Sequence, residues 1–173
     1  MAYTAPRTWV DSELLDASIM NTHVRDNLIA LKAPPSDNYE ANEGADYTEA
    51  ATSLNAIDAT NWRLSVTTTG GDVLLGFVAS ISNSGGGNFT FFDIYDVGNV
   101  AYLGGNDGIC VQETSAANDR DTVSFVWLAT GLAADAYQFE IHWKVSAGTT
   151  TLYAGAGAAN GDVHPQFWAR EVS

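Results

Sequence analysis

The sequence predicts a mainly β protein, a jelly-roll β-sandwich of about eight strands preceded by one N-terminal α-helix. After residue 62, short stretches of alternating or continuous apolar residues are separated by glycine-rich turns, with no helical periodicity between them. Before residue 35, apolar residues recur at spacings of 3 and 4, as they do on one face of a helix. The order of long strands and loops fits a jelly roll better than an immunoglobulin-type sandwich.

The predicted helix has clear signals at both ends. Asp16 is a good N-cap because its carboxylate accepts from free N–H groups of the first turn, and Leu15 and Met20 are spaced as a hydrophobic staple around it. Lys32 favours the negative end of the helix dipole. Pro34 and Pro35 cannot continue the helix, so we expect it to end just before them.

The helix carries one narrow apolar stripe. Its members are Ala17, Met20, Val24, Leu28 and Leu31. An isolated helix of this length is marginal in water, so another surface must hold it. We expect that surface to be another copy of the chain or a docking partner, and the alternative is packing on its own domain. The predicted anchor and oligomerisation residues are Trp9, Leu15, Met20, Val24, Leu28 and Leu31.

The rest of the chain divides into two further parts. Residues 1–35 form the arm and anchor helix, 36–61 a linker with edge strands, and 62–173 the jelly-roll head. Strands are expected near 62–68, 73–81, 89–97, 100–103, 109–111, 121–128, 137–145, 149–154 and 166–172. The cleanest alternation runs from Tyr137 to Val145 and predicts a strand with one buried face and one wet face.

Large side chains in phase with these strands are assigned to the head-domain core or a subunit interface. They are Phe77, Phe91, Phe125, Trp127, Tyr137, Phe139, Ile141, Trp143, Phe167 and Trp168.

The charge balance excludes some partners. Twenty-one acidic residues against seven basic ones give a formal charge of −14, which disfavours binding to nucleic-acid phosphates or to an anionic membrane. The chain opens without a basic and apolar leader, and no apolar run approaches membrane-spanning length. We therefore expect synthesis in a host cytoplasm without secretion. A single cysteine, Cys110, excludes an internal disulfide and is expected to be a small buried residue in a strand.

No pattern of catalytic or metal-ligating residues emerges. His23, His142 and His164 have no partners at zinc spacing, and His142 falls on the expected wet face of its strand. Acidic pairs such as Asp93 with Asp96 could hold Ca²⁺, but solvated turn acids are the preferred interpretation. We expect no catalytic residues, no metal, no cofactor and no enzymatic activity.

Two segments resemble known families. The N-terminal run Pro6-Arg7-Thr8-Trp9-Val10, followed by residues 21–28 and 30–32, resembles the N-terminal segment of many tailed-bacteriophage virion proteins. Where that family commonly has Gly-Glu before the helix, this chain has Ser12-Glu13, and Asp16 replaces the usual Thr cap. At the level of pattern, residues 130–145, 151–155 and 167–172 are similar to the trimeric TNF-like jelly-roll heads of phage fibre and virion-surface proteins.

The resemblance implies a structural role in a virion. It implies a surface-exposed homotrimer, either a capsid decoration or head-fibre protein or a short tail fibre, attached to other virion proteins through its N-terminal segment. A different possibility is a carbohydrate-binding module or receptor-binding tip for host-surface glycans. Its stacking platforms would come from several tyrosines and from Trp62, Trp127, Trp143 and Trp168. Trp127 and Trp143 are in phase with core residues, whereas Trp9 and the tyrosines near the loops are freer to stack on a sugar.

Overall fold

The computed structural model describes residues 7–10, 13–14, 16–41, 45–155 and 164–172. Its helical segments are α1 (Ala17–Met20), the π turn η1 (Asn21–Asp26), α2 (Asn27–Lys32) and the 3-10 turn η2 (Gly105–Asp107). Its strands are β1 (Ser36–Glu40), β2 (Tyr47–Glu49), β3 (Asn55–Ala56), β4 (Arg63–Thr67), β5 (Gly71–Asn83), β6 (Asn88–Asp96), β7 (Ala101–Tyr102), β8 (Cys110–Thr114), β9 (Arg120–Leu132), β10 (Ala136–Val145), β11 (Thr150–Leu152) and β12 (Gln166–Glu171).

Residues 17–32 form one run of helical backbone before the sheets. The Asp16 carboxylate accepts from the backbone N–H of Ile19 at 2.8 Å, which confirms the expected N-cap. Leu15, the other half of the expected staple, lies outside the described residues. The helix ends after Lys32, as the two prolines require. The π turn between α1 and α2 is a difference from the uniform α-helix that the spacing predicts.

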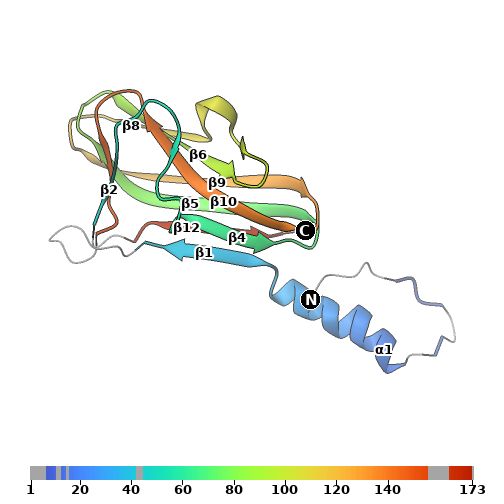
Figure 1. The fold of residues 1–173 in the computed structure, drawn as a ribbon. Helices are drawn as coiled ribbons and strands as arrows, with labels where there is room; N and C mark the ends of the chain where they lie inside the picture. Colours follow the sequence, from blue (N-terminus) through green and yellow to red (C-terminus); the bar gives the residue numbers. More distant parts are fainter. Residues whose placement is uncertain (1–6, 11–12, 15, 42–44, 156–163, 173) are drawn as a thin grey trace.

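Two antiparallel sheets of six strands each face one another. In the first sheet, the long strand β5 pairs with β9 on one side and with β12 and β11 on the other. β12 pairs in turn with β1, and β11 pairs with β2. In the second sheet, β10 lies between β6 and the short strands β3 and β4, while β7 and β8 extend β6. The two layers are visible in Figure 1.

Side-chain carboxylates close one side of the sandwich. Asp37 on β1 accepts from the backbone N–H of Ser65 on β4 at 2.7 Å, across the gap between the sheets. Glu171 on β12 accepts from the backbone N–H of Thr69 at 2.8 Å. Both bonds satisfy edge N–H groups that would otherwise lack partners, so the sheets are joined where β1 and β4 run side by side.

The core between the sheets is aromatic. Trp62 is fully buried, and its ring packs edge-on to Phe77 at 5.7 Å and to Tyr39 at 5.1 Å. Phe77 contacts Phe92 at 5.4 Å, and Phe92 contacts Trp143 at 6.2 Å. These rings link both sheets, because Phe77 comes from β5 while Phe92 and Trp143 come from β6 and β10.

The fold class is confirmed, with two differences of detail. The described residues form twelve strands instead of about eight, because segments of two or three residues such as β3 and β7 pair with longer neighbours and are too short to show a pattern. The stretch 36–61 supplies β1, β2 and β3, which join both sheets. The division at residues 35 and 61 remains a prediction.

The expected wet face of β10 is wrong at the centre of the strand, whereas Gln138 on the same face is exposed as predicted. His142 and Glu140 are both buried, at 8% and 4% exposure, although they alternate with core residues. The reason is tertiary, because the segment after β6 folds over this face and Tyr102 lies against the His142 ring. A period of two marks which side chains share a face, but it cannot reveal a loop that covers the second face.

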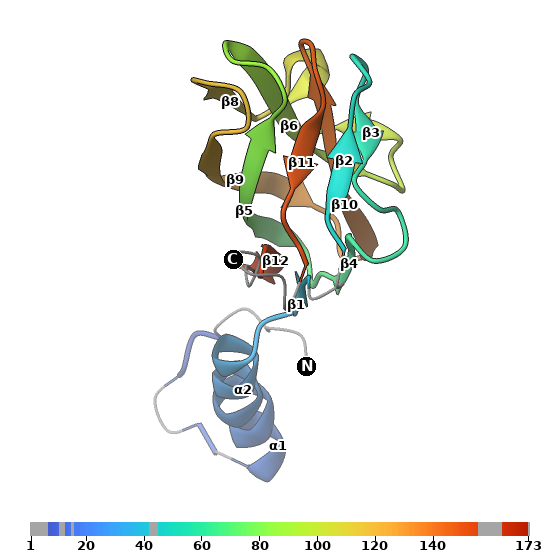
Figure 2. The same cartoon turned by 90° about the vertical axis from the view of Figure 1, so that its left-hand side faces the viewer.

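The N-terminal helix projects from one end of the sandwich. Figures 1 and 2 show it extending away from both sheets, beyond β1 and the C-terminal strand β12. Among the described residues, its segments make their main contacts with one another. The alternative in which the helix packs on its own domain is therefore not what the structure has.

We expect Gly76→Ala to destabilise the protein through Trp168. Gly76 faces the outer side of the first sheet beneath the indole of Trp168, and an added Cβ atom would overlap that ring. The expected loss in unfolding free energy is about 1–3 kcal/mol. Urea unfolding at matched protein concentration checks this, with the same substitution in a Trp168→Ala background as control. Equal losses in both backgrounds would contradict the assigned contact.

Candidate functional site

The apolar stripe of the helix is open to solvent. Met20, Val24, Leu28 and Leu31 are 41%, 38%, 61% and 66% exposed, whereas Asn27 on another side of the helix is only 7% exposed. A helix that buried its apolar side on its own domain would show the reverse order. Nothing among the described residues covers the stripe. Full burial of a Leu or Val side chain would stabilise the protein by roughly 1.5–3 kcal/mol.

The outer face of the first sheet carries a second apolar surface. We call it the first-sheet face and define it as Leu74, Val78, Val126, Leu128 and Trp168. Leu74 stands opposite Leu128, and Gly76 stands opposite both Val126 and Trp168, so these side chains project from the same side of the sheet. Val126 and Leu128 are 56% and 43% exposed. Apolar residues on neighbouring strands of a solvent-facing sheet indicate an interaction surface.

The predicted core or interface residues separate into two groups. Five are buried between the sheets, namely Phe77, Phe139, Ile141, Trp143 and Phe167, and three pack against them while partly buried, namely Phe125, Trp127 and Tyr137. The remaining two, Phe91 and Trp168, are half-buried. The sequence prediction omitted Leu74, Val126 and Leu128, although Val126 and Leu128 alternate with inward-facing residues along β9 and could have been found by that signal.

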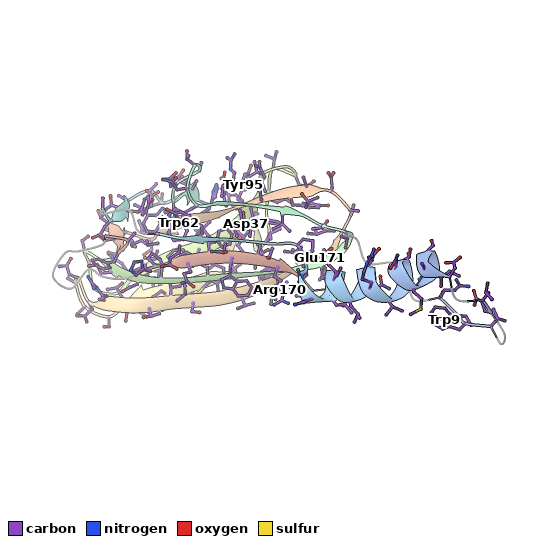
Figure 3. The ribbon with its side chains drawn as sticks, turned by 90° about the horizontal axis from the view of Figure 1, so that it is seen from below. Trp9, Asp37, Trp62, Tyr95, Arg170 and Glu171 are labelled. Carbon is purple, nitrogen blue, oxygen red and sulfur yellow. The ribbon has the colours of Figure 1, made fainter. Side chains whose placement is uncertain are left out.

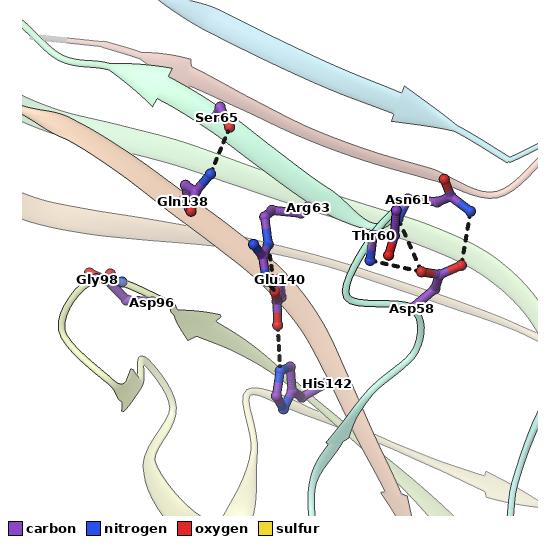
Figure 4. A network of polar contacts seen from close by, with 10 residues as sticks. All are labelled: Asp58, Thr60, Asn61, Arg63, Ser65, Asp96, Gly98, Gln138, Glu140 and His142. Atoms are coloured by element: carbon purple, nitrogen blue, oxygen red, sulfur yellow. Dashed lines mark hydrogen bonds and ion pairs between the residues drawn. The ribbon is translucent and has the colours of Figure 1, made fainter.

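A polar network crosses the covered outer face of the second sheet (Figure 4). Arg63 on β4 donates through Nε to Glu140 Oε1 at 2.7 Å, and Glu140 Oε2 lies 3.1 Å from His142 Nε2. His142 Nδ1 lies 3.2 Å from the Tyr102 hydroxyl group, which donates to the carbonyl oxygen of Leu54 at 3.2 Å. Because every member is partnered, the network joins β4, β10 and β7 and acts as a structural clamp.

Aromatic stacking completes this clamp. The Tyr95 ring stacks on His142 at 4.7 Å between centroids and contacts Tyr102 at 4.9 Å. Lys144 donates to the carbonyl oxygen of Asn106 at 2.8 Å, which holds the same covering segment further along. His142 is thus enclosed by packing and is not placed at an open cleft.

Two carboxylates, Asp93 and Asp58, have pKa values shifted from the usual value for aspartate. Burial raises the pKa of Asp93, although Oδ1 accepts from the N–H groups of Ile94 and Gly104 at 2.7 and 2.9 Å and the charges of His142 and Lys144 oppose the shift. Its Oδ2 atom is buried without a hydrogen-bond partner among the described residues.

The second carboxylate, Asp58, caps a turn. Burial alone would raise the pKa of Asp58, but hydrogen bonds from Asn61, Thr60 and Tyr47 outweigh it and hold the pKa below its usual value. The N–H groups of Thr60 and Asn61 donate to Oδ1 at 2.8 and 3.1 Å. The carboxylate therefore fixes the turn that leads into the buried Trp62.

The expectation that Asp93 and Asp96 are solvated turn acids is wrong. They are 0% and 3% exposed, and Asp96 accepts from the N–H groups of Gly98 and Asn99. These acids satisfy the backbone of the segment that covers the sheet. In the described part of the chain, no three His, Cys, Asp or Glu side chains gather where they could hold a metal ion.

The tryptophans proposed as glycan platforms differ in exposure. Trp62 and Trp143 are buried in the core and cannot stack on a sugar ring. Trp127 is partly buried against the core, and Trp168 is half-buried on the first-sheet face. Trp9 in the N-terminal arm is the tryptophan with a large exposed fraction, 46%. Across the described residues, no helix is both long and apolar enough to cross a membrane.

Comparisons with known proteins bear on the fold. No protein-family model matches the chain, and no curated protein matches its sequence. Among solved structures it is similar to the Eiger TNF from S. frugiperda, with a TM-score of 0.50 at 8% identity over 82% of this chain and 95% of that one.

Two other similar structures have lower scores. The carbohydrate-binding module from Cellvibrio mixtus lichenase 5A gives a TM-score of 0.37 at 11% identity, over 79% of this chain and 98% of that one. The VP2 subviral particle of infectious bursal disease virus gives 0.41 at 12% identity, over 80% of this chain and 37% of that one. The likeness to the Eiger TNF, at 8% identity, shows a shared fold alone.

We expect Asp93→Asn to change how stability depends on pH. A raised pKa means that folded Asp93 holds its proton more tightly than the unfolded chain, so its contribution to stability falls as pH rises through the folded pKa. The variant cannot ionise and lacks this fall. Relative to the wild type, its unfolding free energy should therefore increase between about pH 3 and about pH 7.

Urea unfolding at both pH values measures this difference. Asp107→Asn, which removes a carboxylate at an exposed position of the covering segment, is the matched control. A stability difference between Asp93→Asn and wild type that stays constant with pH would contradict the assignment.

Proposed function

We propose that this chain is a non-enzymatic structural protein of a bacteriophage virion. It is displayed on the particle surface as a homotrimeric capsid decoration, head-fibre or short tail-fibre protein, and its N-terminal segment attaches it to other virion proteins. The observation that carries this proposal is the exposed stripe on a helix that projects from the sandwich, with Leu28 at 61% and Leu31 at 66% exposure.

The physical argument concerns the stability of the helix. A helix of this length gains too little from its own hydrogen bonds to persist in water, and here the sandwich contributes little packing. Three parallel copies would bury the stripe in a common seam, as in a short coiled coil. Joining three anchors in one particle component also raises the overall affinity well above that of a single weak anchor.

The first-sheet face supports association of the heads. Leu74, Val126 and Leu128 form an apolar surface on a chain with a formal charge of −14, which otherwise keeps copies apart. The fold it shares with the Eiger TNF is in keeping with the resemblance to trimeric phage heads that the sequence suggests. Cyclic packing of identical heads would cover this surface on every copy.

Leu28→Asp tests the role of the stripe. A carboxylate in the seam would be desolvated without a partner, so we expect at least a tenfold loss of attachment to particles and a loss of helical circular dichroism. Arg25→Gln on the same helix is the control, because it removes a solvent-exposed ion pair with Asp26 and keeps a good helix former. Unchanged attachment of Leu28→Asp would refute the anchor role.

Leu128→Asp tests the role of the heads. We expect a shift from trimer towards monomer in sedimentation velocity, with the β-sandwich still folded, because Leu128 projects away from the core. Val111→Asp, at an apolar position with 52% exposure on β8, is the matched control and should remain trimeric. A wild-type chain that is monomeric at all concentrations would overturn the trimer.

A further inference from the structure

Exposed apolar side chains lie in the arm before the N-terminal helix and in its first turn. We call this group the tip and define it as Trp9, Val10, Leu14 and Met20. These side chains are 46%, 70%, 86% and 41% exposed, and Leu14 is the most exposed large apolar residue in the described part of the chain. Figure 3 shows Trp9 at the end of the molecule opposite the sandwich.

The arm around the tip is held in place by one carboxylate. Glu13 forms an ion pair with Arg7 and accepts from the backbone N–H of Val10 at 3.4 Å, while its own N–H donates to the Val10 carbonyl oxygen at 3.1 Å. The Arg7 guanidinium lies 5.1 Å from the centre of the Trp9 ring, a cation–π contact. These contacts restrict the Trp9 side chain, which lowers the entropic cost of docking.

Distance separates the tip from the heads. The helix between them spans residues 17–32, and at 1.5 Å per residue it places the tip about 24 Å from the start of β1. The sandwich of the same chain cannot cover it. An exposed tryptophan together with exposed aliphatic side chains has the composition of an interface hot spot.

Charge distinguishes the possible occupants. Residues 7–16 contain three acidic side chains and one basic one, a formal charge of −2, and the basic one, Arg7, is paired with Glu13. Three parallel copies would bring their tips to the same end, where this like charge disfavours contact of one tip with another. A pocket with a basic rim would be attracted. The occupant that fits is therefore a different protein with an apolar pocket and a rim of Lys or Arg side chains.

We infer that the tip is a plug that inserts into such a pocket on another virion protein, and that Val24, Leu28 and Leu31 are left for pairing between copies. This inference rests on the proposed virion role. It divides the N-terminal segment into a distal part for attachment and a proximal part for self-association.

The test uses the full-length chain and particles assembled without it. Trp9→Ala and Leu14→Ala should each lower binding to these particles at least tenfold, while sedimentation velocity shows the wild-type oligomer and circular dichroism the wild-type helix content. Tip variants that bind as tightly as wild type would overturn the plug and leave the proposed function intact. Failure of the wild-type chain itself to bind would instead overturn the proposed function.

Asp16→Asn tests the basic rim. Asparagine is an equally good N-cap, so the helix start is kept while one negative charge is removed. We expect binding to the particles to weaken a few-fold at low salt, with the difference vanishing at high salt. Equal binding by Asp16→Asn and wild type at low salt would overturn the basic rim and favour an uncharged pocket.

Discussion

The aromatic contacts centred on Trp62 and Phe77 hold the two sheets at a fixed distance, and the other features depend on that spacing. The rings join residues from β5 to residues on β6 and β10, so neither sheet buries its inner face without the other. Once the inner faces are filled, strand alternation fixes what projects outward. On the first sheet these are Leu74, Val126 and Leu128, and on the second they are Glu140 and His142.

The outer faces of the two sheets differ in whether the chain covers them. The second sheet is covered by its own chain, where Asp93, His142 and Lys144 each bind the segment after β6. Burying these polar groups is tolerated because nearly all of their atoms have partners. The first-sheet face has no such cover within the described residues, although Val126 and Leu128 are apolar. The polar face is thus satisfied within the chain, whereas Val126 and Leu128 on the apolar face stay exposed.

The N-terminal helix also presents an exposed apolar surface. Its caps and prolines fix where it begins and ends, but among the described residues the sandwich leaves its stripe exposed. A structure with two uncovered apolar surfaces and a strong negative charge is suited to a defined assembly and resists random association. Trp9 lies at the end of the molecule opposite the sandwich (Figure 3), whereas Leu28 lies in α2, so in the proposed assembly attachment and pairing use different parts of the N-terminal segment.

The sequence by itself determined the features that depend on neighbours along the chain. These are the Asp16 cap, the end of the helix at Lys32, the positions of the long strands and the inward set that includes Phe139 and Trp143. It did not determine the π turn, the shortest strands or the burial of His142. Only the tertiary structure decided which sheet has its outer face covered, because a covering loop does not change the alternation of residues in the strand that it covers. For the same reason it alone revealed that the first-sheet face and the helix stripe remain open.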